Sequence, residues 1–100
     1  MKYLMTYRAV EDFLPLARAN RQGHVARLQE FSARGVLLMA GPMQEPLNGD
    51  AVAVFTSREA ALEFVEGDPF VTNGVVANWD VRPWQEVLVP EDGAGSEPAV

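Results

Sequence analysis

The order of its predicted elements places this chain in the α+β class, with the ferredoxin-like arrangement β-α-β-β-α-β. Three observations predict it: a strand-like segment precedes a long amphipathic helix, two apolar segments flank a turn, and a second helix precedes a final strand-like segment. Two β-α-β halves with right-handed crossovers form an antiparallel four-stranded sheet with both helices on one face. The 100 residues suit one such domain.

The first strand and the first helix follow from a change in hydrophobic period. Residues 3–7 alternate between Tyr or Met and other side chains, as expected for a strand. Over residues 10–34 the apolar positions recur every three or four residues, which is typical of an amphipathic helix. Pro15 is tolerated only in a first turn, so the helix should begin near Leu14. Gly35 is the expected C-terminal cap.

A hairpin is expected next. Residues 36–40 form a short apolar run, which predicts a buried strand that ends at Gly41 and Pro42. Residues 45–50 contain Pro, Asn and Gly and are typical of a turn. Residues 51–55 then resume a strand, which we expect to pair with the preceding one.

The second helix has a start signal and a stop signal. Thr56 followed by Glu59 matches the capping-box pattern, with Thr56 as N-cap. Gly67 is expected to end the helix. Its apolar stripe consists of Ala61, Phe64 and Val65.

A short turn and a last strand complete the domain. Asp68 before Pro69 fits the N-cap and the first position of a further helical turn. Residues 75–87 predict the last strand, and Pro83 within it favours a sheet edge or a bulge. We expect the folded domain to cover residues 1–88 and the acidic segment 89–100 to be a disordered tail.

One face of this sheet has no cover within the chain. With 48% apolar residues, the chain has more hydrophobic surface than the core of a small domain needs. We therefore expect a homodimer formed through the open face. The residues expected to line this face are Tyr3, Met5, Val52, Val54, Trp79 and Val81.

Composition argues against several classes of function. A net charge of −6 is unfavourable for binding nucleic acid, whose phosphates require clustered basic residues. The chain has no cysteine and one histidine, so we expect neither a thiolate metal site nor any other metal site. No apolar run approaches the roughly 20 residues that cross a bilayer. The N-terminus is too polar for a signal peptide, and we expect a cytoplasmic protein that does not bind membranes.

The only histidine, His24, and the acid at Asp68 are the candidates for proton transfer. An imidazole hydrogen-bonded to a carboxylate is the smallest set of groups able to move a proton near neutral pH. Each residue also has a structural interpretation: His24 borders the sheet-facing side of its helix, and Asp68 is a normal N-cap. Arg21, one turn before His24, is able to clamp an anion or to pair with a surface acid. Gly41 before Pro42 either leaves room for a ligand or ends a strand.

Several segments together resemble a known family. They are residues 3–7, residues 21–28 with His24, residues 38–42, residues 68–71 with Gly74 and Val75 after them, and residues 81–84. In this combination and order they resemble the YciI-like (YCII-related) family, small ferredoxin-like proteins that form dimeric α+β barrels. The resemblance covers about residues 1–88.

The resemblance implies where the site lies. It assigns a catalytic His-Asp dyad to His24 and Asp68, and it places four further residues around the pocket as substrate-binding residues. These are Arg21, Gly41, Pro42 and Phe70. Related barrels include isomerases, lyases and oxygenases that act on small cyclic or aromatic molecules.

The sequence thus leads to one main hypothesis and two alternatives. The main hypothesis is an enzyme that uses His24 and Asp68 for elimination or isomerisation of a small, aromatic or anionic metabolite, without metal or organic cofactor. The first alternative is a module that binds a small molecule without turning it over. The second is an accessory domain in which the two residues only pack and cap.

Overall fold

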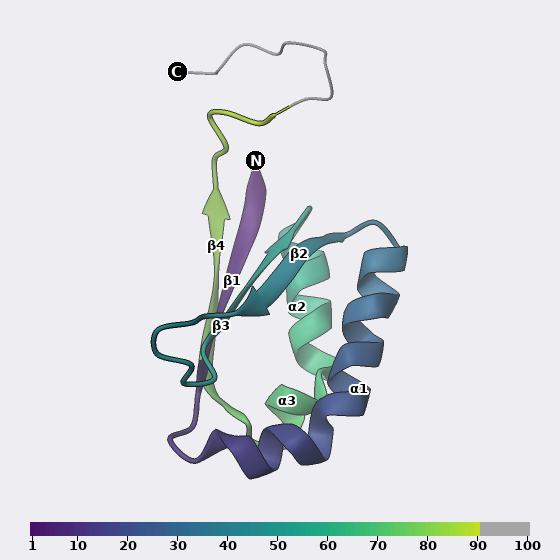
Figure 1. The fold of residues 1–100 in the computed structure, drawn as a ribbon. Coiled ribbons are helices and arrows are strands. Elements are labelled where there is room, and N and C mark those ends of the chain that lie inside the picture. The colour runs from purple at the N-terminus through teal and green to yellow at the C-terminus, as the bar shows by residue number, and fades with distance from the viewer. Residues whose placement is uncertain (91–100) are drawn as a thin grey trace.

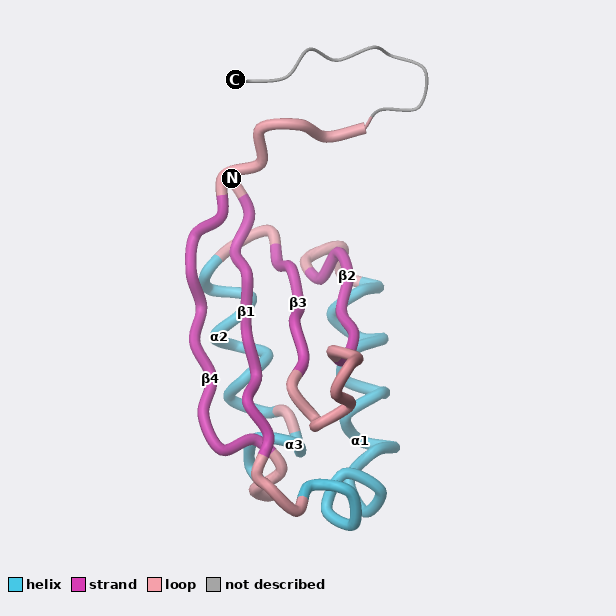
Figure 2. The backbone as a smooth tube through the Cα atoms, turned by 60° about the vertical axis from the view of Figure 1, so that its left-hand side comes forward, coloured by secondary structure: helices cyan, strands magenta, loops and turns pink. Residues whose placement is uncertain are grey.

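The computed structural model describes residues 1–90 and shows a four-stranded antiparallel sheet with helices on one face (Figures 1 and 2). The elements are β1 (Lys2–Ala9), α1 (Phe13–Ala33), β2 (Leu37–Pro42), β3 (Ala51–Phe55), α2 (Arg58–Gly67), α3 (Pro69–Thr72) and β4 (Val76–Trp84). The strand order is β2-β3-β1-β4, so β1 and β3 are the two central strands and pair with each other. The predicted ferredoxin-like class is confirmed.

The long helix α1 begins and ends as its sequence predicts. Its first residue is Phe13, so Pro15 lies in the first turn, where no backbone hydrogen bond is lost. The helix ends at Ala33, and Gly35 follows with a φ of +78°. Glycine adopts this left-handed conformation without a steric penalty, which confirms Gly35 as the residue that terminates the helix.

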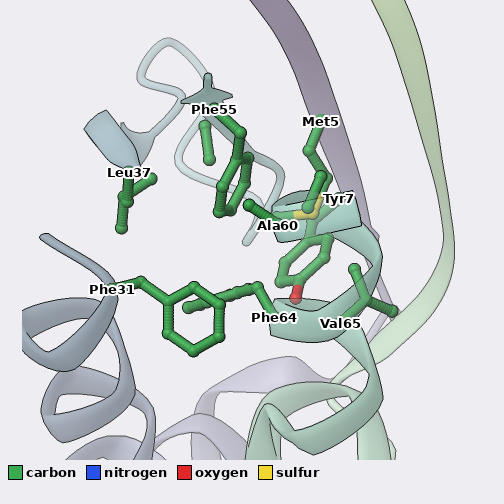
Figure 3. Close-up of a cluster of buried hydrophobic side chains, with 10 residues drawn as sticks. Met5, Tyr7, Phe31, Leu37, Phe55, Ala60, Phe64 and Val65 are labelled. Carbon is green, nitrogen blue, oxygen red and sulfur yellow. The ribbon is translucent and has the colours of Figure 1, made fainter. Parts of the chain in front are cut away.

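Three phenylalanines join the two long helices to the sheet (Figure 3). Phe31 of α1, Phe55 of β3 and Phe64 of α2 are each 0% exposed. The Phe31 and Phe64 rings meet edge to face with centroids 5.2 Å apart, and Phe55 lies 5.5 Å from Phe64. Such aromatic pairs add roughly 0.5–1.5 kcal/mol to the stabilisation from burial itself. This cluster holds α2 in place, and Asp68, which follows the end of α2, lies next to α1.

The prediction that the second strand is buried was wrong. In β2, Leu37 is buried, but Leu38 and Met39 are 46% and 66% exposed. The reason is that β2 lies at the edge of the sheet and has a bulge between Leu37 and Met39. The strand also continues through Gly41 and Pro42, which were expected to stop it; both remain paired with β3.

The capping residue of α2 is one position later than predicted. The N-cap is Ser57, whose hydroxyl oxygen accepts a 3.1 Å hydrogen bond from the backbone N–H of Ala60. The backbone N–H of Thr56 donates to the carbonyl of Val36 at 3.0 Å, so Thr56 still belongs to the end of the sheet and precedes the cap.

Most residues predicted for the open face of the sheet lie on the helix side. Met5 and Tyr7 are 3% and 4% exposed within the core, so alternate residues of β1 point toward the helices. Directly paired residues share a face, and Met5 pairs with Val81 and Tyr7 with Trp79. The residues assigned to the wrong face are Tyr3, Met5, Trp79 and Val81.

Val52 and Val54 do lie on the open face. They pair with Thr6 and Leu4 of β1, and Val54 also pairs with Met39 of β2. Leu4, Met39, Val52 and Val54 form an apolar strip across the three strands. Side chains in a strand alternate between the two faces with a period of two. Assigning the residues of β1 to the wrong face therefore also assigned their paired residues in β4 to the wrong face.

The last strand, β4, ends at Trp84 rather than near residue 87. It is an edge strand, which confirms the edge position predicted for Pro83. The predicted tail over residues 89–100 falls almost entirely outside the described residues. Within residues 1–90, no helix is sufficiently long and apolar to span a membrane.

Candidate active site

His24 and Asp68 meet where α1 passes the junction of α2 and α3. The Nδ1 atom of His24 lies 2.8 Å from the Oδ1 atom of Asp68. Asp68 is 0% exposed, whereas 17% of the His24 side chain is exposed. The pair therefore has one end sealed in the protein and one end open to an incoming molecule.

Two features of α1 allow this approach. Gly23 faces α3, and a Cβ atom on it would lie 3.0 Å from the Cγ atom of Pro69. The absence of a side chain lets the two elements come close. One turn later, the Arg27 guanidinium donates hydrogen bonds to the backbone carbonyls of Glu63 and Phe64, at 2.6 and 2.9 Å. These contacts tie the end of α2 to α1 and hold the Asp68 loop next to His24.

Asp68 serves as cap and as dyad partner at the same time. Its Oδ1 atom accepts from the backbone N–H of Phe70 at 3.1 Å, which is the predicted N-cap bond of α3, as well as contacting His24. Its Oδ2 atom accepts from the hydroxyl of Tyr7 at 2.7 Å. Three donors thus surround a fully buried carboxylate, which offsets the large cost of removing it from water.

Tyr7 is the site residue that the sequence analysis missed. Its ring extends from β1 into the core beneath α2 (Figure 3). Burial, reinforced by the Asp68 carboxylate, raises the pKa of the Tyr7 phenol far above its ordinary value of 10.0. The phenol therefore stays protonated and remains a donor to Asp68. The available signal was its place in a strand on the same face as Met5, since a buried tyrosine hydroxyl needs a partner.

The His24 ring is held in one orientation. It stacks on Phe70 with centroids 3.8 Å apart and planes 2° from parallel, and the edge of Phe64 lies on another side with centroids 6.4 Å away. A carboxylate only accepts hydrogen bonds, so Nδ1 carries the proton that points at Asp68. The other ring nitrogen, Nε2, has no hydrogen-bond partner within residues 1–90. Nε2 is then the atom with a free lone pair.

A cavity of about 450 Å³ lies beside the dyad, between α1 and the helix side of the sheet. This volume is within the range of small-molecule pockets. Most of its walls are apolar, and His24 is part of its lining. The four residues expected around the pocket all line this cavity: Arg21, Gly41, Pro42 and Phe70. Asp68 lies behind His24 and does not line it.

Two lining residues, Arg18 and Leu47, were not expected from the sequence. Leu47 belongs to the β2–β3 connection, whose turn character gave no indication that it borders the cavity. Within residues 1–90, no group of three or more His, Cys, Asp or Glu side chains is arranged to hold a metal ion. The polar groups that the cavity offers to a ligand are an imidazole and two guanidinium groups.

Comparison with known proteins adds sequence relatives and a structural neighbour. The family model described as "YCII-related domain" matches residues 1–85. "Protein YciI" of Escherichia coli O6:H1 is 33% identical, over 88% of this chain and 100% of that protein. A protein of Haemophilus influenzae described as "Uncharacterized protein" is 31% identical over the same shares of both chains.

Among solved structures, 5-chloro-2-hydroxyhydroquinone dehydrochlorinase from Burkholderia phenoliruptrix, in complex with 2,5-dihydroxybenzoquinone, superposes with a TM-score of 0.71. The match covers 86% of this chain and 95% of that one, at 22% sequence identity. At this identity the likeness supports the same fold.

Proposed function

This chain belongs to the YCII-related domain family, and from that premise we propose that it is an enzyme in which His24 and Asp68 perform general acid/base chemistry. The substrate is a small aromatic or anionic metabolite, and the reaction is an elimination or an isomerisation. The single observation that carries the proposal is the 2.8 Å contact between His24 and a fully buried Asp68 at the wall of a cavity.

The geometry supports a specific division of roles. Nε2 of His24 takes a proton from a substrate hydroxyl, or from a carbon next to a carbonyl group. The electron pair left behind forms an enolate or expels a leaving group from a neighbouring carbon. Asp68 keeps the Nδ1 proton in place and stabilises the imidazolium. The imidazolium then gives its proton to another atom of the substrate in an isomerisation, or to water in an elimination.

The structural neighbour offers an analogy for this chemistry. Its name describes a dehydrochlorination, which is a loss of a proton and a chloride ion, and its ligand is a small hydroxylated ring. A reaction of this kind needs a proton acceptor beside a pocket of modest size. Function does not follow from fold, so the analogy supports the reaction class but leaves the proposal resting on the dyad.

We also propose that two copies of the chain associate through the open face of the sheet. Leu4, Met39, Val52 and Val54 form the apolar strip on that face, and Met39 is 66% exposed. Val54 is only 6% exposed in the single chain, so a second copy would chiefly remove Leu4, Met39 and Val52 from water. Sedimentation equilibrium should give twice the chain mass of 11.0 kDa, and Val52→Asp should give the monomer mass.

The enzyme proposal is tested in two steps. A thermal-shift screen of small carboxylic acids, lactones and hydroxylated aromatic compounds first identifies ligands. Each ligand is then incubated with wild type, His24→Ala and Gln22→Ala, and the products are identified by mass spectrometry. Gln22 is an exposed residue of the same helix and is the matched control. Turnover by wild type and Gln22→Ala but not by His24→Ala supports the proposal. Binding without any product points to the non-catalytic binding module.

A further inference from the structure

All charged side chains that line the cavity are basic. The chain has 14 acidic residues and 8 Lys or Arg. Yet the lining contains Arg18, Arg21 and His24, and no acidic residue. In a protein of net charge −6, a cavity with this composition is locally positive and attracts anions.

Neither arginine is used by the fold within residues 1–90. Four arginines have partners: Arg27 donates to two backbone carbonyls, Arg34 pairs with Glu63, Arg8 pairs with Asp50, and Arg58 donates to the carbonyl of Val81. Arg82, like Arg18 and Arg21, has none within residues 1–90, but Arg82 does not line the cavity. In the part of the chain that the structure describes, Arg18 and Arg21 make no hydrogen bond and no ion pair. Their guanidinium groups are exposed and available to a ligand.

The spacing along α1 brings these groups to the same cavity. Arg18, Arg21 and His24 follow one another at intervals of three residues, each a step of about 60° around the helix axis, and all three line the cavity. Each interval corresponds to a rise of about 4.5 Å, which places the two arginine backbone positions about 4.5 and 9 Å before His24 along the axis. A substituted six-membered ring spans a comparable distance.

We propose that Arg18 and Arg21 together bind a carboxylate of the substrate, so that the substrate class is small aromatic or cyclic carboxylic acids. This inference rests on the proposed function and deepens it. The apolar walls hold the ring, the arginines hold the carboxylate at one end, and Nε2 of His24 meets the reacting hydroxyl or carbon at the other. Guanidinium groups suit this task because they remain charged and match a carboxylate with two parallel hydrogen bonds.

The test compares two probes of the same ring and similar shape, 2,5-dihydroxybenzoate, which carries a negative carboxylate, and 2,5-dihydroxybenzamide, which carries a neutral amide in its place. Dissociation constants are measured by NMR titration for wild type, Arg18→Gln, Arg21→Gln, the double variant and Arg34→Gln. Arg34 caps the C-terminal end of the same helix and does not line the cavity, so Arg34→Gln is the control. All variants are first checked for an unchanged circular dichroism spectrum.

We expect wild type and Arg34→Gln to bind the carboxylate about tenfold more tightly than the amide, given the strength of charge-assisted hydrogen bonds at a partly exposed site. Each single variant should lose a few-fold of this preference, and the double variant should bind both probes about equally. Raising the NaCl concentration from 50 to 500 mM should weaken binding of the carboxylate alone.

The possible outcomes distinguish this inference from the proposed function on which it rests. Equal binding of both probes by wild type, or a preference that survives in the double variant, overturns the inference. If both probes then still shift the His24 imidazole signals in the NMR titration, the site at the dyad still stands. An arginine-dependent preference with no turnover of any ligand keeps the inference and removes the catalytic proposal. Failure of both probes to bind overturns the inference alone, because the proposed function is tested by the ligand screen and the product analysis.

Discussion

The hydroxyl of Tyr7 donates a 2.7 Å hydrogen bond to Asp68, on the carboxylate oxygen that does not contact His24. Asp68 thereby links a residue of the central strand β1 to a residue of α1, 17 positions further along the chain. The sheet, the α2–α3 junction and the long helix are joined at this one buried carboxylate. A change to the side chain of Tyr7, His24 or Asp68 should therefore affect the other two.

The contact with Asp68 predicts the tautomer of His24. In the neutral ring the proton should be on Nδ1, because the carboxylate is an acceptor only. The chain has one histidine, so long-range ¹H–¹⁵N NMR spectra show a single imidazole and need no assignment. We expect the two nitrogen shifts of the Nδ1–H form. The shifts of the Nε2–H form, which is the more common one in water, would contradict the dyad geometry.

Removing the Tyr7 hydroxyl should weaken the folded state. In Tyr7→Phe, the buried Oδ2 atom of Asp68 loses its only hydrogen-bond donor within residues 1–90. An unsatisfied buried group costs about 1–3 kcal/mol, and urea unfolding should show a loss of this size. Tyr3→Phe is the matched control, since the Tyr3 hydroxyl makes no hydrogen bond within residues 1–90. Equal stability of the two variants would mean that the Tyr7–Asp68 bond contributes nothing.

The burial of Tyr7 should also be visible in alkaline titration. Burial, with the nearby Asp68 carboxylate, raises the pKa of Tyr7 well above 10.0, so its phenol stays protonated in the folded protein. The raised pKa belongs to the folded state, and the unfolded chain releases its proton first. The ionisation of Tyr7 therefore does not change the free energy of unfolding below about pH 10, and lowers it as the pH rises above that value.

Tyrosinate absorbance at 295 nm measures this ionisation. In native protein the Tyr7 phenol should ionise only together with unfolding. Tyr7→Phe should leave the native titration curve unchanged. Two phenols ionising together in native protein would show that Tyr7 is not buried against Asp68.

The position of the α2 cap gives a test of local structure. Ser57→Ala removes the side-chain oxygen that accepts from Ala60, which should cost about 1 kcal/mol of unfolding free energy. Thr56→Ala changes an exposed side chain outside the cap and should cost less than about 0.5 kcal/mol. Chemical denaturation of both variants distinguishes the two positions, and the reverse order of losses would restore Thr56 as the cap.

Local patterns predicted the elements because each rests on neighbouring residues. The change of period after β1, Pro15 at the start of α1 and Gly35 at its end together located the first β-α unit within a few residues. Asp68 with Pro69 likewise located the start of α3. The choice between Thr56 and Ser57 was different, because Thr56 is held by a hydrogen bond to Val36, which lies 20 residues earlier in the chain.

Features that depend on distant contacts were less predictable. The alternation of side chains in β1 shows that the strand has two faces but not which face contacts the helices. Met5 was therefore assigned to the open face, whereas it lies in the core. The exposure of Met39 follows from the edge position of β2, which the apolar run itself does not encode. Tyr7 was missed because its partner, Asp68, lies 61 residues away. His24 and Asp68 were suggested as a pair by their residue types and then by resemblance to a family, and their hydrogen bond is a property of the folded chain.

The central claim, that His24 is the proton acceptor, is tested most directly by single-turnover conversion of a ligand that stabilises the wild-type protein. His24→Ala should retain its fold and still bind the ligand, but convert it at least about 100-fold more slowly, because general acid–base catalysis contributes about 10²–10⁴-fold. Conversion by folded His24→Ala at the wild-type rate would contradict the claim.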